Sequence, residues 1–293
     1  MQMKTHQTNK KTKTSKTDQS LSYLDTSVLR KIRFGHPRQK EALASIPTPH
    51  YVSTYVLMEF YRSVLLYFID PYFEAAERRH PTFLDACNFY AEAFSSNDLK
   101  TLVGVILLLL QEQDFAPADP DKKEICRRKL QDHIFNIAEE LTSLYKNVGT
   151  SGEACSKLRK HLVRKDLHER DAHLLDFAGV FKDDKTCRSK CSIDVLLTNQ
   201  KHEAAYKCVI ANGASPTSTS TTQQLSKALK LRIESPDKTT CTRCSKIGDV
   251  IITLNCPTNF QIHTLDTSFY TLGPCFERIV RVHPSVASLL KDK

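Results

Sequence analysis

The sequence predicts an α/β fold, and three observations lead to that prediction. Two short apolar segments, Leu21–Leu24 and Gln261–Leu265, have the length of buried strands, and an aspartate follows each of them. Segments with apolar residues at helical spacing lie between them. The composition, with 40% hydrophobic and 26% charged residues, is that of an ordinary soluble globular protein. We therefore expect one large domain or two modest ones.

The N-terminal residues 1–19 form a basic tail in which lysines alternate with Thr, Gln and Asn. Such a tail cannot bury enough apolar surface to order itself, so we expect it to be disordered. The net charge of +9 and the pI of about 9.0 favour an anionic partner. Two interpretations of the tail stay open: it solubilises the protein, or it attracts phosphate groups without sequence preference.

The sequence predicts a cytoplasmic protein without a membrane anchor. The N-terminus lacks the apolar region of a signal peptide. The most apolar run, Leu102–Leu110, has about half of the length that spans a bilayer, so we expect a buried helix there. Ten cysteines without a secretory signal favour a reducing compartment over a disulfide framework.

Short strands and helices are expected to alternate over the first seventy or so residues. Apolar positions recur at helical spacing from Thr54 to Phe68, with Ser53 as the capping residue and Asp70-Pro71 as the stop signal. Thr26 and Ser27 are expected at or near the start of an earlier helix. The other predicted elements are a strand at 21–24, helices from 28 and from 36 to 44, and a strand near 51–53.

The middle of the chain is expected to be helical to about residue 176, without a convincing strand, and irregular thereafter. A basic segment, Lys157–Arg170, is either a solvated helix face or a phosphate-contact surface. The predicted helices lie near 71–80, 82–94, 98–113, 120–147, 151–177 and 202–211, followed by a loop at 214–224 and a helix or strand at 225–233.

The C-terminal part is predicted to form a helix, a strand and a second strand in that order. The helix begins near Asp249 and its apolar part covers Val250–Leu254, with a turn at Pro257 before the strand Gln261–Leu265. The remaining predictions are a turn-rich segment at 267–276, a strand at 277–282 and a helix from 284.

Four acidic residues have contexts that suit a metal site. Asp25 and Asp266 follow predicted strands, whereas Glu59 and Asp249 lie near the starts of predicted helices. In a mostly parallel sheet these places fall on one edge, so we expect the carboxylates to cluster. Clustered carboxylates repel one another unless they are protonated or bind a cation. Mg²⁺ or Mn²⁺ suits such oxygen ligands, and it activates water and neutralises charge on a phosphodiester. Glu59 has a simpler alternative: it lies on the solvent-exposed face of its helix and takes no part in a metal site.

The motifs around these acids resemble those of PIN-domain nucleases and follow the order of that family. They are LDTSVL at 24–29, VSTYVLMEF at 52–60, IGDVIITL at 247–254 and HTLDTSF at 263–269. The resemblance implies a PIN-like α/β/α sandwich around a short, mostly parallel sheet. It also implies Mg²⁺- or Mn²⁺-dependent cleavage of single-stranded RNA, as in VapC-type toxins. Carried over by motif, the metal ligands are Asp25, Glu59, Asp249 and Asp266, and the supporting polar groups are Thr26, Ser27, Thr264 and Ser268.

The resemblance covers roughly residues 20–70 and 240–285. We therefore expect residues 20–293 to form one PIN-like nuclease domain, interrupted at 72–235 by a large helical and irregular insertion. Such an insertion is expected to gate the site or to bind a partner. An antitoxin or another protein partner, and a homodimer, are expectations that follow from the family.

Two rival functions stay open. The chain is either a metal-dependent ribonuclease or a non-catalytic RNA-binding or assembly module with a PIN-like fold. Metal-dependent DNA cleavage would use the same site on a different substrate. Replacing Asp25 by Asn separates the first two, because it should abolish cleavage by a nuclease and be silent in a binding module.

Two cysteine pairs predict a structural zinc site. Cys187 and Cys191 are separated by three residues, and Cys241 and Cys244 by two, in short hydrophilic segments. Thiolate pairs at this spacing can chelate one tetrahedral ion, and free thiols are the alternative. The other cysteines, Cys208 and Cys275 among them, are expected to be packing residues. We find no local signature of a Cys/His nucleophile.

Overall fold

The computed structural model describes residues 21–93, 116–144, 146–147, 196–235 and 246–285, together with 104, 106, 174 and 288. The predicted tail at 1–19, the basic segment Lys157–Arg170 and the four cysteines predicted to bind zinc lie outside the described residues. Among the described residues, no helix combines the length and apolar character needed to cross a bilayer.

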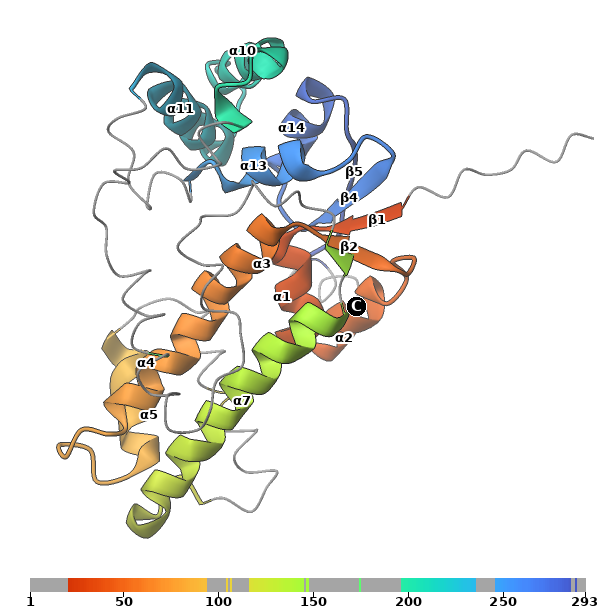
Figure 1. Ribbon diagram of the computed structural model, residues 1–293. Coiled ribbons are helices and arrows are strands. Elements are labelled where there is room, and N and C mark those ends of the chain that lie inside the picture. Colours follow the sequence, from red (N-terminus) through yellow and green to blue (C-terminus); the bar gives the residue numbers. More distant parts are fainter. Residues whose placement is uncertain are drawn as a thin grey trace, which may run out of the picture.

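A parallel sheet of five strands forms the centre of the described part of the chain, in the order β3-β2-β1-β4-β5 (Figure 1). The strands are short, which agrees with the predicted α/β class and its short parallel sheet. Their bounds are Leu21–Leu24 for β1, His50–Val52 for β2, Lys146–Asn147 for β3, Phe260–Thr264 for β4 and Ile279–Val282 for β5.

Strand β1 lies in the middle of the sheet, and its pairing with β4 joins the two ends of the sequence. Leu21 pairs with Phe260, and Leu24 pairs with His263. On one side of the sheet successive strands of the sequence follow each other from β1 through β2 to β3, and on the other side from β4 to β5, in the opposite direction across the sheet. The order therefore reverses between β1 and β4, and ligands of open parallel sheets bind beyond the carboxyl ends of the strands at such a point.

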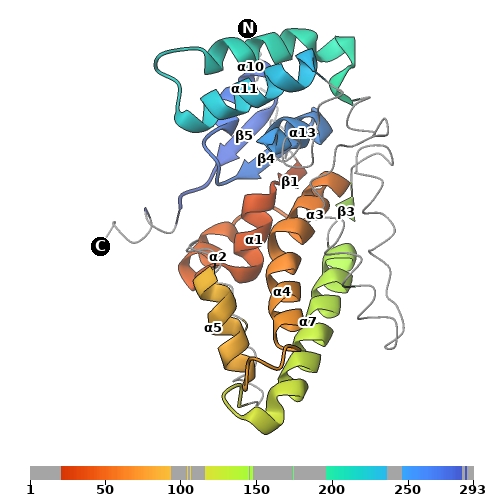
Figure 2. The ribbon, with the colours of Figure 1, turned by 90° about the vertical axis from the view of Figure 1, so that its left-hand side faces the viewer.

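Helices cover both sides of the sheet (Figures 1 and 2). Figure 1 shows α13 and α14 on one side, backed by α10 and α11, and α1 and α2 on the other. On that second side α4, α5 and α7 extend away from the sheet (Figure 2). The bounds are α1 Thr26–Phe34, α2 Pro37–Leu43, α3 Thr54–Phe60, α4 Leu66–Glu74, α5 Phe83–Ala93, α7 Lys123–Leu144, α10 Glu203–Gly213, α11 Ser220–Glu234, α13 Gly248–Asn255 and α14 Phe269–Cys275, with short 3₁₀ helices η2 Pro120–Lys122 and η5 Gln200–His202.

One long helix corrects the prediction of a stop at Asp70-Pro71. It begins after Ser53, whose hydroxyl accepts a hydrogen bond from the Val56 N–H as predicted, and continues through Pro71 to Glu74. A proline inside a helix costs about 3 kcal/mol. The side chains of Phe68, before the proline, and Tyr72, after it, are completely buried. Burying each of them contributes roughly 1.5–3 kcal/mol to stability, which offsets the cost of the proline. A π-helical segment, η1 (Tyr61–Leu65), joins α3 to α4.

Three further predictions were wrong. Residues 146–147 form strand β3 on the edge of the sheet, where only helix was expected. Part of the Ser/Thr-rich loop is the start of α11, because Thr219 caps this helix by accepting a hydrogen bond from the Thr222 N–H. The segment after Asp266 forms α14 instead of turns, because Phe269 and Leu272 bury an apolar face that the short pattern did not reveal.

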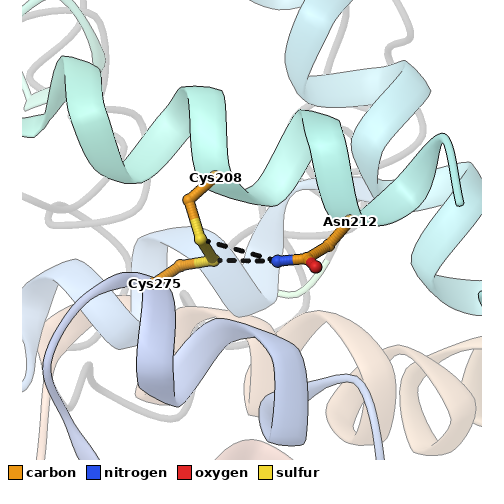
Figure 3. Close-up of a disulfide and its surroundings, with 3 residues drawn as sticks. All are labelled: Cys208, Asn212 and Cys275. Atoms are coloured by element: carbon orange, nitrogen blue, oxygen red, sulfur yellow. Dashed lines mark hydrogen bonds between the residues drawn. A yellow bond between two sulfur atoms is a disulfide. The ribbon is translucent and has the colours of Figure 1, made fainter.

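A disulfide joins Cys208 of α10 to Cys275 of α14 (Figure 3). The Asn212 amide points at the bond and donates hydrogen bonds to both sulfur atoms, at 3.5 Å and 3.4 Å. The prediction that both cysteines are unpaired packing residues was therefore wrong. The sequence could not reveal the pair, because 67 positions separate the two thiols and only the packing of α10 on α14 brings them together.

Candidate active site

A cavity of about 410 Å³ opens at the carboxyl ends of β1 and β4, at the point where the strand order reverses. All four acids singled out in the sequence line it, although they come from four separate segments of the chain. The lining residues are Asp25, Thr26, Ser27, Arg30, Glu59, Arg62, Ser63, Tyr67, Asp249 and Asp266.

Asp25 lies directly after β1 and is 3% exposed. Its carboxylate caps α1 by accepting hydrogen bonds from the backbone N–H groups of Thr26, at 2.7 Å, and Ser27, at 3.3 Å. The helix cap is thus Asp25 itself, and Thr26 and Ser27 lie at the start of the helix as predicted. Burial raises the pKa of Asp25, and the hydrogen bonds from Ser27 and Thr264 oppose that increase.

Two hydroxyls connect the end of β4 to the start of α1. Thr264 donates a 2.8 Å hydrogen bond to Asp25, and its oxygen accepts a 2.9 Å hydrogen bond from the Asp266 N–H. The Ser27 hydroxyl donates to Asp25 and accepts from the Leu265 N–H at 3.0 Å. These hydrogen bonds fix the position of the end of β4 relative to the start of α1, and both hydroxyls bind the Asp25 carboxylate.

Glu59 approaches the same cavity from α3. Its carboxylate accepts a 2.7 Å hydrogen bond from the Thr26 hydroxyl. The other oxygen lies against the backbone of Gly248, so closely that a Cβ atom at this glycine would clash with it. Burial raises the pKa of Glu59 to about 7, the Asp25 charge adds to the increase, and Arg62 and Arg30 oppose it.

Asp249 and Asp266 complete the acidic wall. Asp249 is the second residue of α13 and accepts a 2.7 Å hydrogen bond from the Ser268 hydroxyl. Asp266 accepts a 2.8 Å hydrogen bond from the Ser268 N–H, so Ser268 contacts both acids. Burial, followed by the charges of Asp25 and Asp266, raises the pKa of Asp249 well above its ordinary value. The four predicted supporting residues therefore all donate hydrogen bonds to acids of the site.

Four other lining residues were not predicted as site residues: Arg30, Arg62, Ser63 and Tyr67. For three of them the sequence contained a usable signal. Arg62 and Ser63 stand three and four positions after Glu59, and Arg30 stands four positions after Thr26. Residues at these spacings share a helix face, so the helices that present Glu59 and Thr26 also present them.

The chemistry of the donors suits a divalent ion, although their present arrangement does not hold one. Among the described residues, no group of three or more His, Cys, Asp or Glu side chains is placed so that it could hold a metal ion. The carboxylates instead accept hydrogen bonds from neighbouring hydroxyls. Oxygen ligands of this kind suit Mg²⁺ or Mn²⁺, and a cation would offset the burial and the repulsion that raise the pKa of Asp249. Binding would require side-chain rotations that exchange hydroxyl partners for the ion.

Comparisons with protein-family models, with curated proteins and with solved structures found no match. A functional assignment therefore depends on the residues of the cavity and on the motifs in the sequence.

Proposed function

We propose that this chain is a metal-dependent nuclease with a PIN-like fold, which hydrolyses phosphodiester bonds of single-stranded RNA. One observation supports the proposal most: the acids that follow β1 and β4 and the acids of α3 and α13 line a single cavity. These four segments are also the four in which the sequence resembles the PIN motifs. A purely structural role is poorly compatible with the raised pKa values of Asp25, Glu59 and Asp249, because ionising buried, neighbouring carboxylates costs stability.

In this proposal Asp25, Glu59, Asp249 and Asp266 hold Mg²⁺ or Mn²⁺. Such an ion would supply charge neutralisation at the phosphodiester and a lower pKa for an attacking water molecule. The chain's own part is to keep the carboxylates in place. The hydroxyls of Thr264 and Ser268 limit the orientations of the Asp25 and Asp249 carboxylates, and the Ser268 N–H limits that of Asp266.

The test is cleavage of end-labelled single-stranded RNA with Mn²⁺, Mg²⁺ or EDTA, comparing the wild type with Asp25→Asn. We expect cleavage that depends on the metal and is lost in the variant, while RNA binding is retained or tighter because one negative charge is removed. Cleavage that persists in Asp25→Asn would place the activity elsewhere or in a contaminant. RNA binding without cleavage by either protein would favour the non-catalytic RNA-binding or assembly module.

The other family expectations, an antitoxin and a homodimer, stay predictions, and so does the structural zinc inferred from the cysteine pairs. A cytoplasmic location also stays a prediction. The Cys208–Cys275 disulfide weighs against it, because such bonds persist mainly in oxidising compartments.

A further inference from the structure

We propose that Arg30, Arg62 and Tyr67 form a second part of the cavity, which binds the phosphodiester chain of a single-stranded nucleic acid and stacks one of its bases. We call these three residues the strand subsite. The inference deepens the proposed nuclease function, since it assigns the residues that would hold the strand beside the acids. It is carried by the helix geometry, the charges and the composition of the cavity wall.

The π-helical segment η1 accounts for the presence of Tyr67 in the wall. Glu59, Arg62, Ser63 and Tyr67 all line the cavity, so one continuous face of this long helix is turned toward it. In a regular α-helix the residue seven positions after Glu59, which is Leu66, would share its face most closely. The π-helical turn contains an extra residue and shifts the following face by one position, so Tyr67 takes that place. π-Helical turns occur frequently at functional sites.

The two arginines supply the positive charge that a phosphate needs in an acidic cavity. Four carboxylates line the wall, and in the absence of cations they would repel a nucleic acid. Arg30 reaches the wall from α1 and Arg62 from η1, and the charges of both lower the pKa of Glu59. The planar guanidinium of an arginine binds phosphate through two parallel hydrogen bonds. The pair is therefore suited to a phosphate that lies next to the acids.

Tyr67 supplies the aromatic surface. Its side chain is half-buried, so part of the ring is accessible from the cavity that it lines. Aromatic rings beside basic residues are the usual means of binding single strands, because every base can stack on them whatever its identity. Duplex bases are already stacked on one another, so the ring favours a single strand.

A simpler account would give the arginines only one task, the neutralisation of Glu59. The two accounts differ in the response of nucleic-acid binding to salt. An arginine that contacts a phosphate displaces a counterion from the nucleic acid on binding. The affinity therefore falls with salt, and loss of the arginine reduces the steepness of this fall, the slope of log affinity against log salt, by about 0.7 for a single strand. An arginine that only neutralises Glu59 leaves this slope unchanged.

The experiment measures binding of fluorescent single-stranded RNA and DNA oligonucleotides of one sequence to the full chain in EDTA, over a range of salt concentrations. The variants are Arg30→Gln, Arg62→Gln, Tyr67→Ala and Tyr67→Phe. Arg38→Gln is the control, because Arg38 lies on α2 and does not line the cavity. We expect each arginine variant to weaken binding roughly tenfold and to lower the salt slope. Tyr67→Ala should weaken it about 5- to 100-fold and Tyr67→Phe hardly at all.

The proposal would be overturned if both arginine variants kept the affinity and the salt dependence of the wild type. It would also be overturned if the Arg38→Gln control lost as much affinity as the Arg30 and Arg62 variants. If an Arg62→Gln chain fails to fold, as judged by circular dichroism, Arg62→Lys replaces it. Lysine keeps the charge but loses the bidentate geometry, so a loss of affinity with a retained slope is expected. Comparing RNA with DNA identifies which strand the subsite prefers.

Cleavage assays on the same proteins separate this inference from the proposed function. Specific loss of binding in the variants, without cleavage by any of the proteins, would retain the strand subsite and reject the nuclease. Cleavage by the wild type with unchanged binding by all variants would retain the nuclease and reject the strand subsite.

Discussion

The Thr264 hydroxyl donates a 2.8 Å hydrogen bond to the carboxylate of Asp25, and 239 positions of sequence separate the two residues. Both side chains are buried, at 0% and 3% exposure. The same hydroxyl oxygen accepts a 2.9 Å hydrogen bond from the Asp266 N–H. One side chain of β4 thus sets the positions of the two acids that follow β1 and β4.

Replacing Thr264 by Val removes this contact while keeping the shape of the side chain. We expect a loss of stability on the order of 1–3 kcal/mol, because Asp25 loses a buried hydrogen bond and Asp266 loses an acceptor for its N–H. The pKa of Asp25 should rise further, since the Thr264 hydrogen bond lowers it. Urea denaturation and RNA cleavage measure the two effects. Thr264→Ser retains the hydroxyl and should retain most activity; equal losses in the Val and Ser variants would contradict this role.

Gly248 is expected to be required by Glu59 and not by the backbone. A Cβ atom here would clash with the flexible end of the Glu59 side chain, so Gly248→Ala should push the carboxylate away from Thr26. We expect a reduction in cleavage of about tenfold or more, with a change in melting temperature of only a few degrees. Gly104→Ala is the matched control, because a Cβ atom at Gly104 meets no atom of the described residues within 4 Å. Unchanged cleavage by Gly248→Ala would show that the position of Glu59 is unimportant.

Replacing Glu59 by Gln should stabilise the protein at alkaline pH. Burial raises the pKa of Glu59 to about 7 from its ordinary 4.5, so the ionised form costs folding energy. This cost is fully present above about pH 7, shrinks as the pH falls from 7 to 4.5, and is gone below 4.5, where both states are protonated. We expect a gain on the order of 1–3 kcal/mol in EDTA near pH 8, shrinking toward pH 5. Chemical denaturation at several pH values measures it; a gain independent of pH would refute the assignment.

His263 is expected to make the protein less stable in acid. Burial and the neighbouring charges of His283, Arg281 and His50 lower the pKa of His263 to about 4 from its ordinary 6.5. The unfolded chain takes up a proton below about pH 6.5 and the folded chain does not, so stability is lost as the pH falls from 6.5 toward 4. The loss near pH 5 should be on the order of 1–2 kcal/mol.

Glu59 has the opposite effect on stability in the same pH range, so the pH dependence of the wild type alone does not reveal the contribution of His263. Comparing the wild type with His263→Gln isolates it, because Glu59 contributes equally to both proteins. We expect the difference in free energy of unfolding between wild type and variant to change with pH between about 7 and 5. A constant difference would mean that His263 does not titrate as inferred.

Breaking the Cys208–Cys275 disulfide should lower stability. The bond closes a loop across 67 positions of sequence, and closing a loop of this length typically contributes about 2–4 kcal/mol. We expect dithiothreitol to lower the urea midpoint of the wild type, and Cys208→Ser/Cys275→Ser to show that lower midpoint with or without the reductant. A wild-type midpoint that does not respond to reductant would indicate that the two thiols are free in solution.

Much of the fold was predictable because its signals are local. Ser53 caps its helix, and the strand at Leu21–Leu24 and the acids that follow β1 and β4 are where the sequence indicated. The continuation of the helix through Pro71 was not predictable, since it depends on the burial of Phe68 and Tyr72 by other elements. Strand β3 was missed for a similar reason, because two residues become a strand only through the neighbour with which they pair.

The sequence by itself determined the α/β class, the four acidic residues and the hydroxyl residues around them, because capping, periodicity and strand-end position act over a few neighbouring residues. Only the tertiary structure decided which groups share the cavity. Hydrogen bonds such as Thr26–Glu59 and Thr264–Asp25 connect residues 33 and 239 positions apart, and the disulfide connects α10 to α14. Contacts of this kind form when the order of the sheet reverses between β1 and β4 and packing turns the helices toward that edge, and no local pattern encodes them.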